Sequence, residues 1–330
     1  MRAYFYEKAG AAIDVLVVGT LPDPVPETGE VRVRVTHSAV NPTDVKRRKI
    51  GRELDQSPRI IPNNDGAGII DQVGNGVPAS RIGQRVWIFG AQAGRPNGTA
   101  ATYVVLPSRQ AIALPDNASL TDGACLGVPA VTAHRGCFGD GSIAGKTVLV
   151  TGAAGRVGAY AVQLAKWAGA RVIATVGSPE KAAATTALGA DLVLDYGRDD
   201  VVKAVLTFTG GTGVDRLIDT AFSQTVGLAP QLVRPNGVIT AYSSDADASP
   251  KIPFVQLMHL NILIRPFGIF GMPAAAQDQA FSDITAALRA GVLKHRVGHH
   301  TTFDNMISAH ALMDGAGAWG TVVVDVAGAG

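Results

Sequence analysis

The stretch KTVLVTGAAGRVGAYAVQLAKWAGA, residues 146–170, constrains the fold more than any other part of the chain. An apolar run leads directly into a turn of small residues, and the turn opens an amphipathic segment with helical periodicity. The turn has the form A-x-G-x-x-G, in which the middle glycine lets the backbone approach a pyrophosphate and the last one lets the helix pack closely on the strand. The spacing predicts a dinucleotide-binding turn; the alternative is an ordinary tight strand-to-helix connection. The turn residues are Ala153, Ala154, Gly155, Arg156, Val157 and Gly158.

The strand-then-helix alternation continues beyond this turn. Alternating units of this length are typical of a parallel sheet with helices on both faces. The sequence therefore predicts an α/β domain with a doubly wound parallel sheet. Strands are expected at 147–151, 171–176, 191–195, 214–219, 237–242 and 261–267, and helices at 157–168, 179–188, 200–208 and 223–233.

The chain before residue 120 has a different pattern. EVRVRVTHSAV (30–40) alternates valine with arginine, as a half-exposed strand does, and further short strands are expected at 66–77, 83–90 and 101–107. This series predicts a β-rich domain of barrel or sandwich type, and a length of 330 residues fits two domains. An expected helix at 274–291 and an expected terminal strand at 319–326 are assigned to that first domain. The expected domains are residues 1–123 with 268–330, and residues 124–267.

Composition excludes several classes of protein. The net charge is +2 on 29 basic and 27 acidic residues, which gives no support to a nucleic-acid partner or an anionic membrane surface. The most apolar stretches are interrupted by Arg265, Pro266 or glycines, so no membrane span is expected. Two cysteines, Cys125 and Cys137, cannot form a four-cysteine zinc site, and the first residues contain no apolar signal segment. A reducing, cytoplasmic setting is therefore expected.

The end of the second expected strand indicates which dinucleotide the domain binds. The fingerprint predicts a carboxylate about 20 residues after its glycines, for the ribose 2′-hydroxyl, but Gly177 stands there. Ser178 instead offers a hydroxyl at a helix start, and Lys181 offers a positive charge. These groups suit the 2′-phosphate of NADPH. The alternative is a solvated surface lysine, beside a Glu180 that already suits the helix dipole.

Several spaced segments together resemble a known family. They are NPTDVKRRKIG (41–51), NNDGAGIIDQVGNGV (63–77), GQRVW (83–87), LGVPAVTAHRG (126–136), the dinucleotide turn with its strands, and MISAHALMDGAGAWGTVVVDV (306–326). In this order they resemble the zinc-free, zeta-crystallin-like quinone oxidoreductases, a branch of the medium-chain dehydrogenase/reductase superfamily. The resemblance implies a GroES-like β-rich catalytic domain formed by both ends of the chain, with a Rossmann domain between them.

The same comparison implies that the catalytic zinc of the alcohol dehydrogenase relatives is absent. Asn41 stands where those relatives have a cysteine, and Asn64 and Asp65 stand where they have histidine and glutamate. Asparagine is a poor zinc ligand beside thiolate or imidazole. No metal site is therefore expected, and the pair His299 and His300 is interpreted as part of a polar loop.

The resemblance places Asn41 and Asp44 beside the nicotinamide and the substrate. Asn41 is expected to donate a hydrogen bond to the reduced oxygen, and Asp44 to orient neighbours or pass a proton; alternatively, the segment is a turn in which Asp44 caps a short helix. Lys46 replaces an aromatic residue common in the family, so VKRRK makes the substrate pocket basic or else forms a solvated face.

The remaining expectations also follow from the resemblance. Thr132 is expected near the nicotinamide, Tyr196 near the adenosine phosphate, and Phe267, Gly268 and Ile269 beside the carboxamide. A homodimer through the last Rossmann strand is expected, around residues 260–267. The expected activity is NADPH-dependent hydride transfer to a quinone or similar conjugated carbonyl. The alternatives are an enal or enone double-bond reductase and a non-catalytic, crystallin-like NADPH-binding protein.

Overall fold

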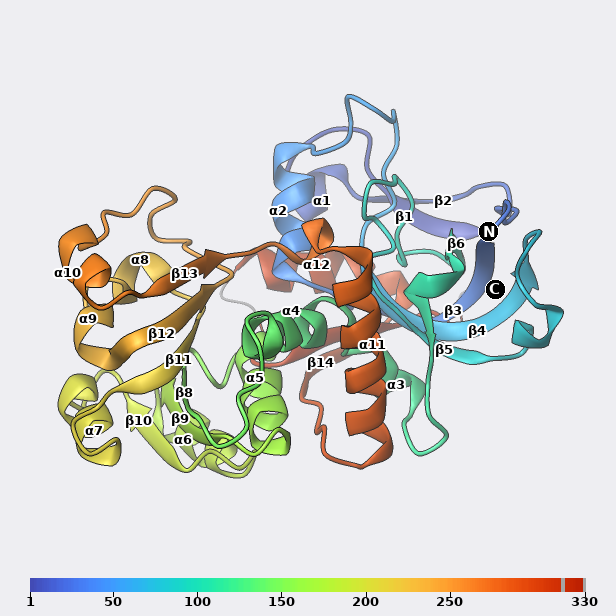
Figure 1. Cartoon of the computed structure of the whole chain (residues 1–330). Coiled ribbons are helices and arrows are strands. Elements are labelled where there is room, and N and C mark those ends of the chain that lie inside the picture. Colours follow the sequence, from blue (N-terminus) through green and yellow to red (C-terminus); the bar gives the residue numbers. More distant parts are fainter. Residues whose placement is uncertain (316–317, 329–330) are drawn as a thin grey trace. The chain divides into compact units, whose positions relative to one another are not determined.

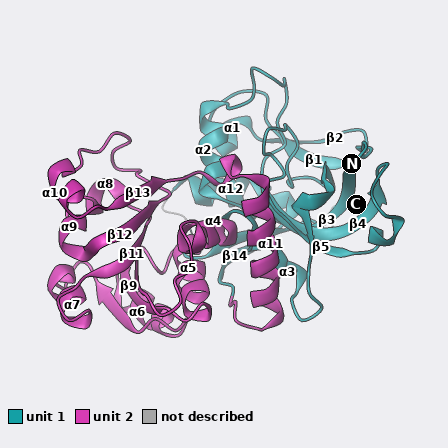
Figure 2. Cartoon of the chain, viewed as in Figure 1, with its two compact units in different colours: residues 1–128, 295–330 teal, residues 129–294 magenta. Residues whose placement is uncertain are grey.

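The computed structural model describes residues 1–315 and 318–328, which divide into two compact units (Figures 1 and 2). Unit 1 contains residues 1–128 and 295–330, and unit 2 contains residues 129–294. The expected domain boundaries differ from this division mainly in residues 268–294, which cluster with unit 2. The physical reason lies in helix α11 (Ala274–Arg289), whose Asp283 accepts a hydrogen bond from His134 at 2.8 Å.

Unit 1 is built on an antiparallel sheet in the order β14-β15-β3-β4-β5-β7, in which β14 alone pairs in parallel and β6 pairs with β3. The valine–arginine alternation of β3 is confirmed, because Val31, Val33 and Val35 are buried in the core of this unit. The strands are β1 (Arg2–Phe5), β2 (Val17–Thr20), β3 (Glu30–Val40), β4 (Asp65–Val73), β5 (Arg85–Ile88), β6 (Tyr103–Pro107), β7 (Ala111–Ala113), β14 (Val297–Thr302) and β15 (Thr321–Asp325). The helices are α1 (Ala12–Val15), α2 (Pro42–Ile50), α3 (Leu120–Ala124) and α12 (Met306–Asp314), and α4 (Gly127–Phe138) begins in this unit.

The expected doubly wound fold of unit 2 is confirmed. Its parallel strands lie in the order β10-β9-β8-β11-β12-β13, so chain order reverses direction across the sheet between β8 and β11. Aliphatic side chains of the central strands, such as Leu149, Ile173 and Leu217, form the core. The strands are β8 (Thr147–Val150), β9 (Arg171–Val176), β10 (Leu192–Asp195), β11 (Val214–Asp219), β12 (Val233–Ala241) and β13 (Leu263–Pro266). The helices besides α11 are α5 (Arg156–Trp167), α6 (Pro179–Thr186), α7 (Val201–Phe208), α8 (Phe222–Thr225), α9 (Ala229–Leu232) and α10 (Phe254–His259).

Two local expectations are wrong. The helix expected at 223–233 is divided into α8 and α9, because Gly227 and Pro230 interrupt the helical hydrogen bonds between them. The pair His299 and His300 lies in strand β14 and not in a loop. Among the described residues, no helix is both long enough and apolar enough to cross a membrane. Cys125 and Cys137 are both buried, and they are not joined in a disulfide bond.

Candidate functional site

Nearly all of the predicted cofactor residues in unit 2 follow the carboxyl ends of its strands. The A-x-G-x-x-G turn follows β8, Gly177 follows β9, Tyr196 follows β10, and Phe267 follows β13. Because the strands are parallel, these segments lie along one edge of the sheet, beside the point where the strand order reverses. Ligands of open α/β sheets bind at this position. Thr132 is the exception among these predicted residues, since it lies on helix α4 and is nearly buried.

The turn after β8 has the geometry that the fingerprint requires. A Cβ on Gly158 would lie 2.4 Å from the carbonyl oxygen of Gly152 and 2.7 Å from the Cα of Ala153, so only glycine lets α5 pack this closely. Gly155, the N-cap of α5, is exposed and, as a glycine, has no side chain with which to cap the helix. Ala153 is fixed to the next strand, because its N–H donates to the carbonyl of Thr175 at 2.9 Å. A rigid turn that leads into a helix N-terminus can hold a pyrophosphate.

The turn after β9 lacks a carboxylate at the expected place. Gly177 lies so close to the Tyr196 ring that an added Cβ would be 2.4 Å from the phenol oxygen. Ser178 is the N-cap of α6, and its hydroxyl accepts a hydrogen bond from the Lys181 N–H at 3.3 Å. Among the described residues, the half-buried Lys181 ammonium has no ion-pair or hydrogen-bond partner. The helix start and the ammonium together suit an anion.

The carboxyl ends of β8 and β11 contain polar groups that the sequence analysis missed. The Thr151 hydroxyl donates to the buried Asp219 carboxylate at 2.7 Å and accepts from the Thr220 N–H at 3.0 Å. Asp219 also accepts from the Ala221 N–H at 2.9 Å, which fixes the turn after β11. Their position at the carboxyl end of a predicted strand was the available signal.

The last predicted cofactor segment, Phe267 to Ile269, follows β13. The Phe267 N–H donates to the carbonyl of Ala241 at 2.9 Å, and its ring lies 6.2 Å from the Tyr242 ring. Gly268 is extended and leads into a short 3₁₀ turn that begins at Ile269. Arg156 and Val157, in the first turn of α5, are half-buried.

In unit 1 the predicted catalytic residues belong to a buried network of amides and carboxylates. The Asn41 side-chain amide donates to Asp65 Oδ2 at 2.7 Å. The Asn64 side-chain amide donates to Asp44 Oδ1 at 2.6 Å, and the Asn41 backbone N–H donates to Asp44 Oδ2 at 2.8 Å. Each of the four residues is at most 1% exposed. Asp44 thereby caps the start of α2, which is the alternative role that the sequence analysis gave it, and it also fixes the Asn64 side chain.

Asp65 has a structural contact of its own. Its Oδ2 accepts from the Val128 N–H at 2.7 Å, which satisfies an amide in the first turn of α4. A Cβ on Gly127 would lie 2.0 Å from Asp65 Oδ1, so this glycine leaves just enough room for the carboxyl group.

The two carboxyl groups cannot both be ionised easily. Burial, followed by the like charge of Asp44, raises the pKa of Asp65 to about 8. Burial also raises the pKa of Asp44, although hydrogen bonds from Asn41 and Asn64 oppose that shift. The raised pKa favours the protonated form of Asp65 at neutral pH, which removes one negative charge from the network.

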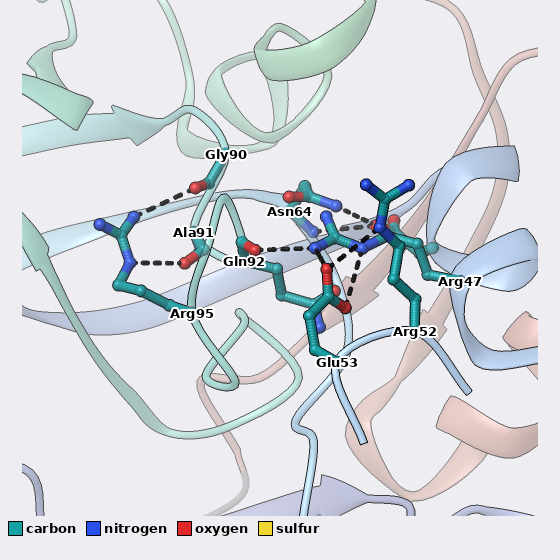
Figure 3. Close-up of polar contacts among 9 residues, drawn as sticks. Arg47, Arg52, Glu53, Asn64, Gly90, Ala91, Gln92 and Arg95 are labelled. Atoms are coloured by element: carbon teal, nitrogen blue, oxygen red, sulfur yellow. Dashed lines mark hydrogen bonds and ion pairs between the residues drawn. The ribbon is translucent and has the colours of Figure 1, made fainter. Parts of the chain in front are cut away.

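A second layer holds the surroundings of this network in place (Figure 3). The Arg47 guanidinium forms an ion pair with Glu53 and donates to the Gln92 carbonyl at 2.9 Å. The loop that contains Gln92 is held from its other side by Arg95, which donates to the carbonyls of Ala91 and Gly90 at 3.0 and 3.1 Å. Some buried polar atoms near the network have no hydrogen-bond partner among the described residues: Thr43 Oγ1, Asn64 Oδ1, Asp65 Oδ1 and Gln92 Nε2. Such atoms can receive a ligand.

The VKRRK run is divided between interior and surface. Arg48 is fully buried and forms an ion pair with Asp314 at 2.6 Å, and Arg47 is held as described above. The interpretation of the whole run as a solvated face is therefore wrong, because two of its charges are compensated inside unit 1. Lys46 is exposed.

The residues around Asn41 do not fit a zinc ion. Neither a thiolate nor an imidazole belongs to the network. The amide N–H groups of Asn41 and Asn64 already occupy oxygens of Asp65 and Asp44, which would otherwise be the metal ligands.

Two family models match the chain in order. The alcohol dehydrogenase GroES-like domain matches residues 27–116, and the zinc-binding dehydrogenase family matches residues 157–289. Among curated relatives, the quinone oxidoreductase of Rattus norvegicus is 26% identical over 305 residues, which cover 91% of this chain and 90% of the relative.

Solved structures agree with this assignment over nearly the whole chain. An NAD-dependent alcohol dehydrogenase superposes with a TM-score of 0.86 at 29% identity, covering 99% of this chain and 100% of its own. A 2-haloacrylate reductase superposes with a TM-score of 0.85 at 26% identity and the same coverage. A mycobacterial protein in complex with NADPH superposes with a TM-score of 0.80 at 25% identity, again with 99% and 100% coverage.

The dinucleotide turn, the reversal of strand order and the two matching family models agree with each other. They assign a nicotinamide cofactor to unit 2 and a GroES-like fold to unit 1. The chain is an oxidoreductase and belongs to the medium-chain dehydrogenase/reductase superfamily.

Proposed function

We propose that this oxidoreductase uses NADPH to transfer hydride to a quinone or a similar conjugated carbonyl, without zinc. The observation that carries the proposal is the amide–carboxylate network of Asn41, Asp44, Asn64 and Asp65. The resemblance described above relates these positions to the metal ligands of zinc-dependent alcohol dehydrogenases. An acceptor that needs no strong Lewis acid is therefore required, and a quinone is such an acceptor.

The bound nicotinamide supplies the hydride, and the residues of the chain stabilise the product. One side-chain N–H of Asn41 donates to Asp65, which holds the amide in a fixed orientation. The other N–H can donate to the oxygen on which negative charge develops. Protonation of Asp65 supports this role, because a second carboxylate charge next to that oxygen would oppose the reaction.

The choice of NADPH is supported by the turn after β9. Gly177 provides no carboxylate for a ribose 2′-hydroxyl, and Lys181 provides a cation without a partner among the described residues. The Ser178 hydroxyl, which accepts from the Lys181 N–H, keeps its own hydrogen for a phosphate oxygen. A 2′-phosphate would be bound by these groups.

A double-bond reductase is the second candidate function. The favouring observation is the 26% identity and TM-score of 0.85 with a 2-haloacrylate reductase, whose substrate is a conjugated acid. Exposed Lys46 suits such a charged acceptor better than a neutral quinone. A non-catalytic NADPH-binding protein is the remaining alternative.

A homodimer through β13 is part of the proposal. β13 is the edge strand of the sheet of unit 2, so one side of its backbone has no partner strand among the residues that the structure describes. Leu263 on this strand is 45% exposed, and on α10 Phe254 is 64% and Met258 is 50% exposed. Exposed apolar side chains on and near a strand edge favour pairing with a second copy.

The test measures NADPH oxidation with three acceptors: 1,4-benzoquinone, 2-cyclohexenone and 2-chloroacrylate. The proposal expects benzoquinone to have the highest kcat/KM, whereas a preference for chloroacrylate or cyclohexenone would establish the second candidate. NADPH binding without turnover of any acceptor would support the non-catalytic alternative and refute both enzymatic functions.

The role of Asn41 is tested with Asn41→Ala and a matched control, Asn75→Ala, which changes an exposed asparagine in a turn. Loss of one donor to a developing oxyanion is expected to lower kcat about 100-fold in Asn41→Ala. The control is expected to retain wild-type kcat. A kcat for Asn41→Ala within threefold of wild type, in a folded variant, would exclude Asn41 from the chemistry.

A further inference from the structure

Three side chains on neighbouring strands of unit 1 offer metal ligands close to one another. They are His37 on β3, His300 on β14 and Asp325 on β15, and their ligand atoms all lie within 4.8 Å of one another. None of them belongs to the amide–carboxylate network. The cluster therefore needs an explanation of its own.

The register of the sheet places these side chains on the same face. His37 is paired with Asp325 in the antiparallel ladder between β3 and β15. His300 is paired with Val323, which lies two residues before Asp325 on β15. Paired residues, and alternate residues of one strand, point to the same face of a sheet. The backbone thus brings the three side chains together without any unusual conformation.

Hydrogen bonds select the nitrogen that His37 offers. The Thr36 hydroxyl donates its hydrogen to the Ala67 carbonyl at 3.0 Å, so it must accept from the His37 Nδ1–H, which lies 3.1 Å away. The lone pair is then on Nε2, and in this structure it accepts from the Thr121 hydroxyl at 3.2 Å. Metal-binding histidines are oriented in this way, with the second ring nitrogen bound to an outer group.

The other two side chains, Asp325 and His300, differ in how firmly they are held. Asp325 Oδ1 accepts from the Ala327 N–H at 3.0 Å, which orients the carboxylate and leaves Oδ2. His37 and Asp325 are half-buried and His300 is exposed.

We propose that His37, His300 and Asp325 bind one divalent transition-metal cation, such as Zn²⁺ or Co²⁺. Two imidazoles and one carboxylate form a set that binds such cations and leaves coordination positions for water. Metal–ligand bonds of about 2.1 Å place neighbouring ligand atoms roughly 3.0–3.5 Å apart, so the atoms must approach by no more than about 1.8 Å. The exposed His300 side chain can make that movement. Binding a cation at His37 Nε2 would also displace the hydrogen bond that this nitrogen accepts from the Thr121 hydroxyl.

The cation would connect strands that the sheet leaves weakly joined. β14 is the edge strand and pairs only with β15 within the described residues. A metal held by β14, β15 and β3 would fix this edge. The proposal is independent of the proposed function, because it involves neither the cofactor nor the acceptor.

The test titrates metal-free protein with Co²⁺ and follows visible absorption, then displaces Co²⁺ with Zn²⁺ and measures the stoichiometry by calorimetry. Wild type is expected to bind one ion per chain. His300→Ala and Asp325→Asn are expected to bind at least about tenfold more weakly, since each lacks one ligand. The matched control is His299→Ala, which removes an exposed histidine next to His300 whose side chain points to the opposite face.

The thermal midpoint of each variant, measured with and without Zn²⁺, shows whether the variant is folded. Zn²⁺ is expected to raise the thermal midpoint of wild type and His299→Ala, but not that of His300→Ala, an exposed position whose metal-free midpoint should equal that of wild type. Absence of binding to wild type would overturn the proposal. Equal affinities for wild type and His300→Ala, or equal losses in His299→Ala and His300→Ala, would also overturn it.

Discussion

Replacing Lys181 with alanine tests the cofactor assignment most directly. Lys181 lies in the first turn of α6, where the helix dipole disfavours a cation unless an anion is bound. Its half-buried ammonium has no hydrogen-bond or ion-pair partner among the described residues, so its removal breaks no polar contact there. Any loss in affinity therefore reports on the ligand.

The expected magnitude follows from one charge-assisted hydrogen bond. Such a bond contributes about 1–3 kcal/mol, which corresponds to roughly a 5- to 150-fold increase in the Kd for NADPH. NADH has no 2′-phosphate, so its Kd is expected to remain within about twofold of the wild-type value. Calorimetric titration of both cofactors into both proteins measures this difference.

Helix α7 provides a matched control. Lys203 stands three residues after the N-cap Asp200, as Lys181 stands three residues after Ser178, and it is exposed. Lys203→Ala is expected to leave both dissociation constants unchanged. Equal losses of NADPH and NADH affinity in Lys181→Ala, or no loss at all, would refute the assignment of the phosphate to this turn.

Three further predictions concern the turn, the network and the edge strand. Gly158→Ala places a Cβ 2.4 Å from the Gly152 carbonyl oxygen and is expected to lower the free energy of unfolding, measured by urea denaturation, by about 1–3 kcal/mol. The Cβ of Gly155→Ala would have no neighbour nearer than 3.1 Å, so this variant is expected to keep its stability and lose cofactor affinity. Equal stability losses in the two variants would contradict this prediction. Burial raises the pKa of Asp65 to about 8, so the folded state keeps a proton that the unfolded state loses near pH 4. The free energy of unfolding is therefore expected to fall by at most about 5 kcal/mol as pH rises from about 4 to about 8. Urea denaturation of Asp65→Asn over the same pH range should show a weaker pH dependence. Leu263→Lys on β13 is expected to convert a dimer into a monomer in light scattering, while Lys203→Glu leaves the mass unchanged; a monomeric wild type would refute the dimer.

Most of the fold of unit 2 could be predicted from local signals. Each strand is a short apolar run that ends at a turn residue, and Gly155 and Gly177 were predicted to bind the cofactor from their positions after such runs. Thr132, Tyr196 and Phe267 were predicted from the resemblance alone. Carboxyl ends of parallel strands meet at one edge whatever the side-chain details are. The prediction of one helix at 223–233 was wrong for a local reason too, since Gly227 and Pro230 lie inside that segment.

The site in unit 1 could be predicted only in part, because it depends on pairing between distant strands. Asn41 and Asp44 were identified through resemblance, but their partners Asp65 and Asn64 are 24 and 20 residues away along the chain. The register that pairs Ala39 with Asp65 brings them together. The His37 cluster depends on the same kind of information, since its third residue is separated from the first by almost the whole chain.

The absence of zinc ligands and the protonation of Asp65 are consequences of the same arrangement. Asn41 and Asn64 are neutral donors, and each satisfies one carboxyl group that would otherwise be buried without compensation. A cysteine in place of Asn41 would remove the donor to Asp65, and as a thiolate it would add a negative charge beside Asp44. Restoring the two missing metal ligands would therefore not rebuild a zinc site unless the carboxyl groups changed as well. Under the proposed function, the network would take the place of a metal centre, and its fixed amide dipoles with one retained proton would provide the polarity that a cation supplies in zinc-dependent relatives.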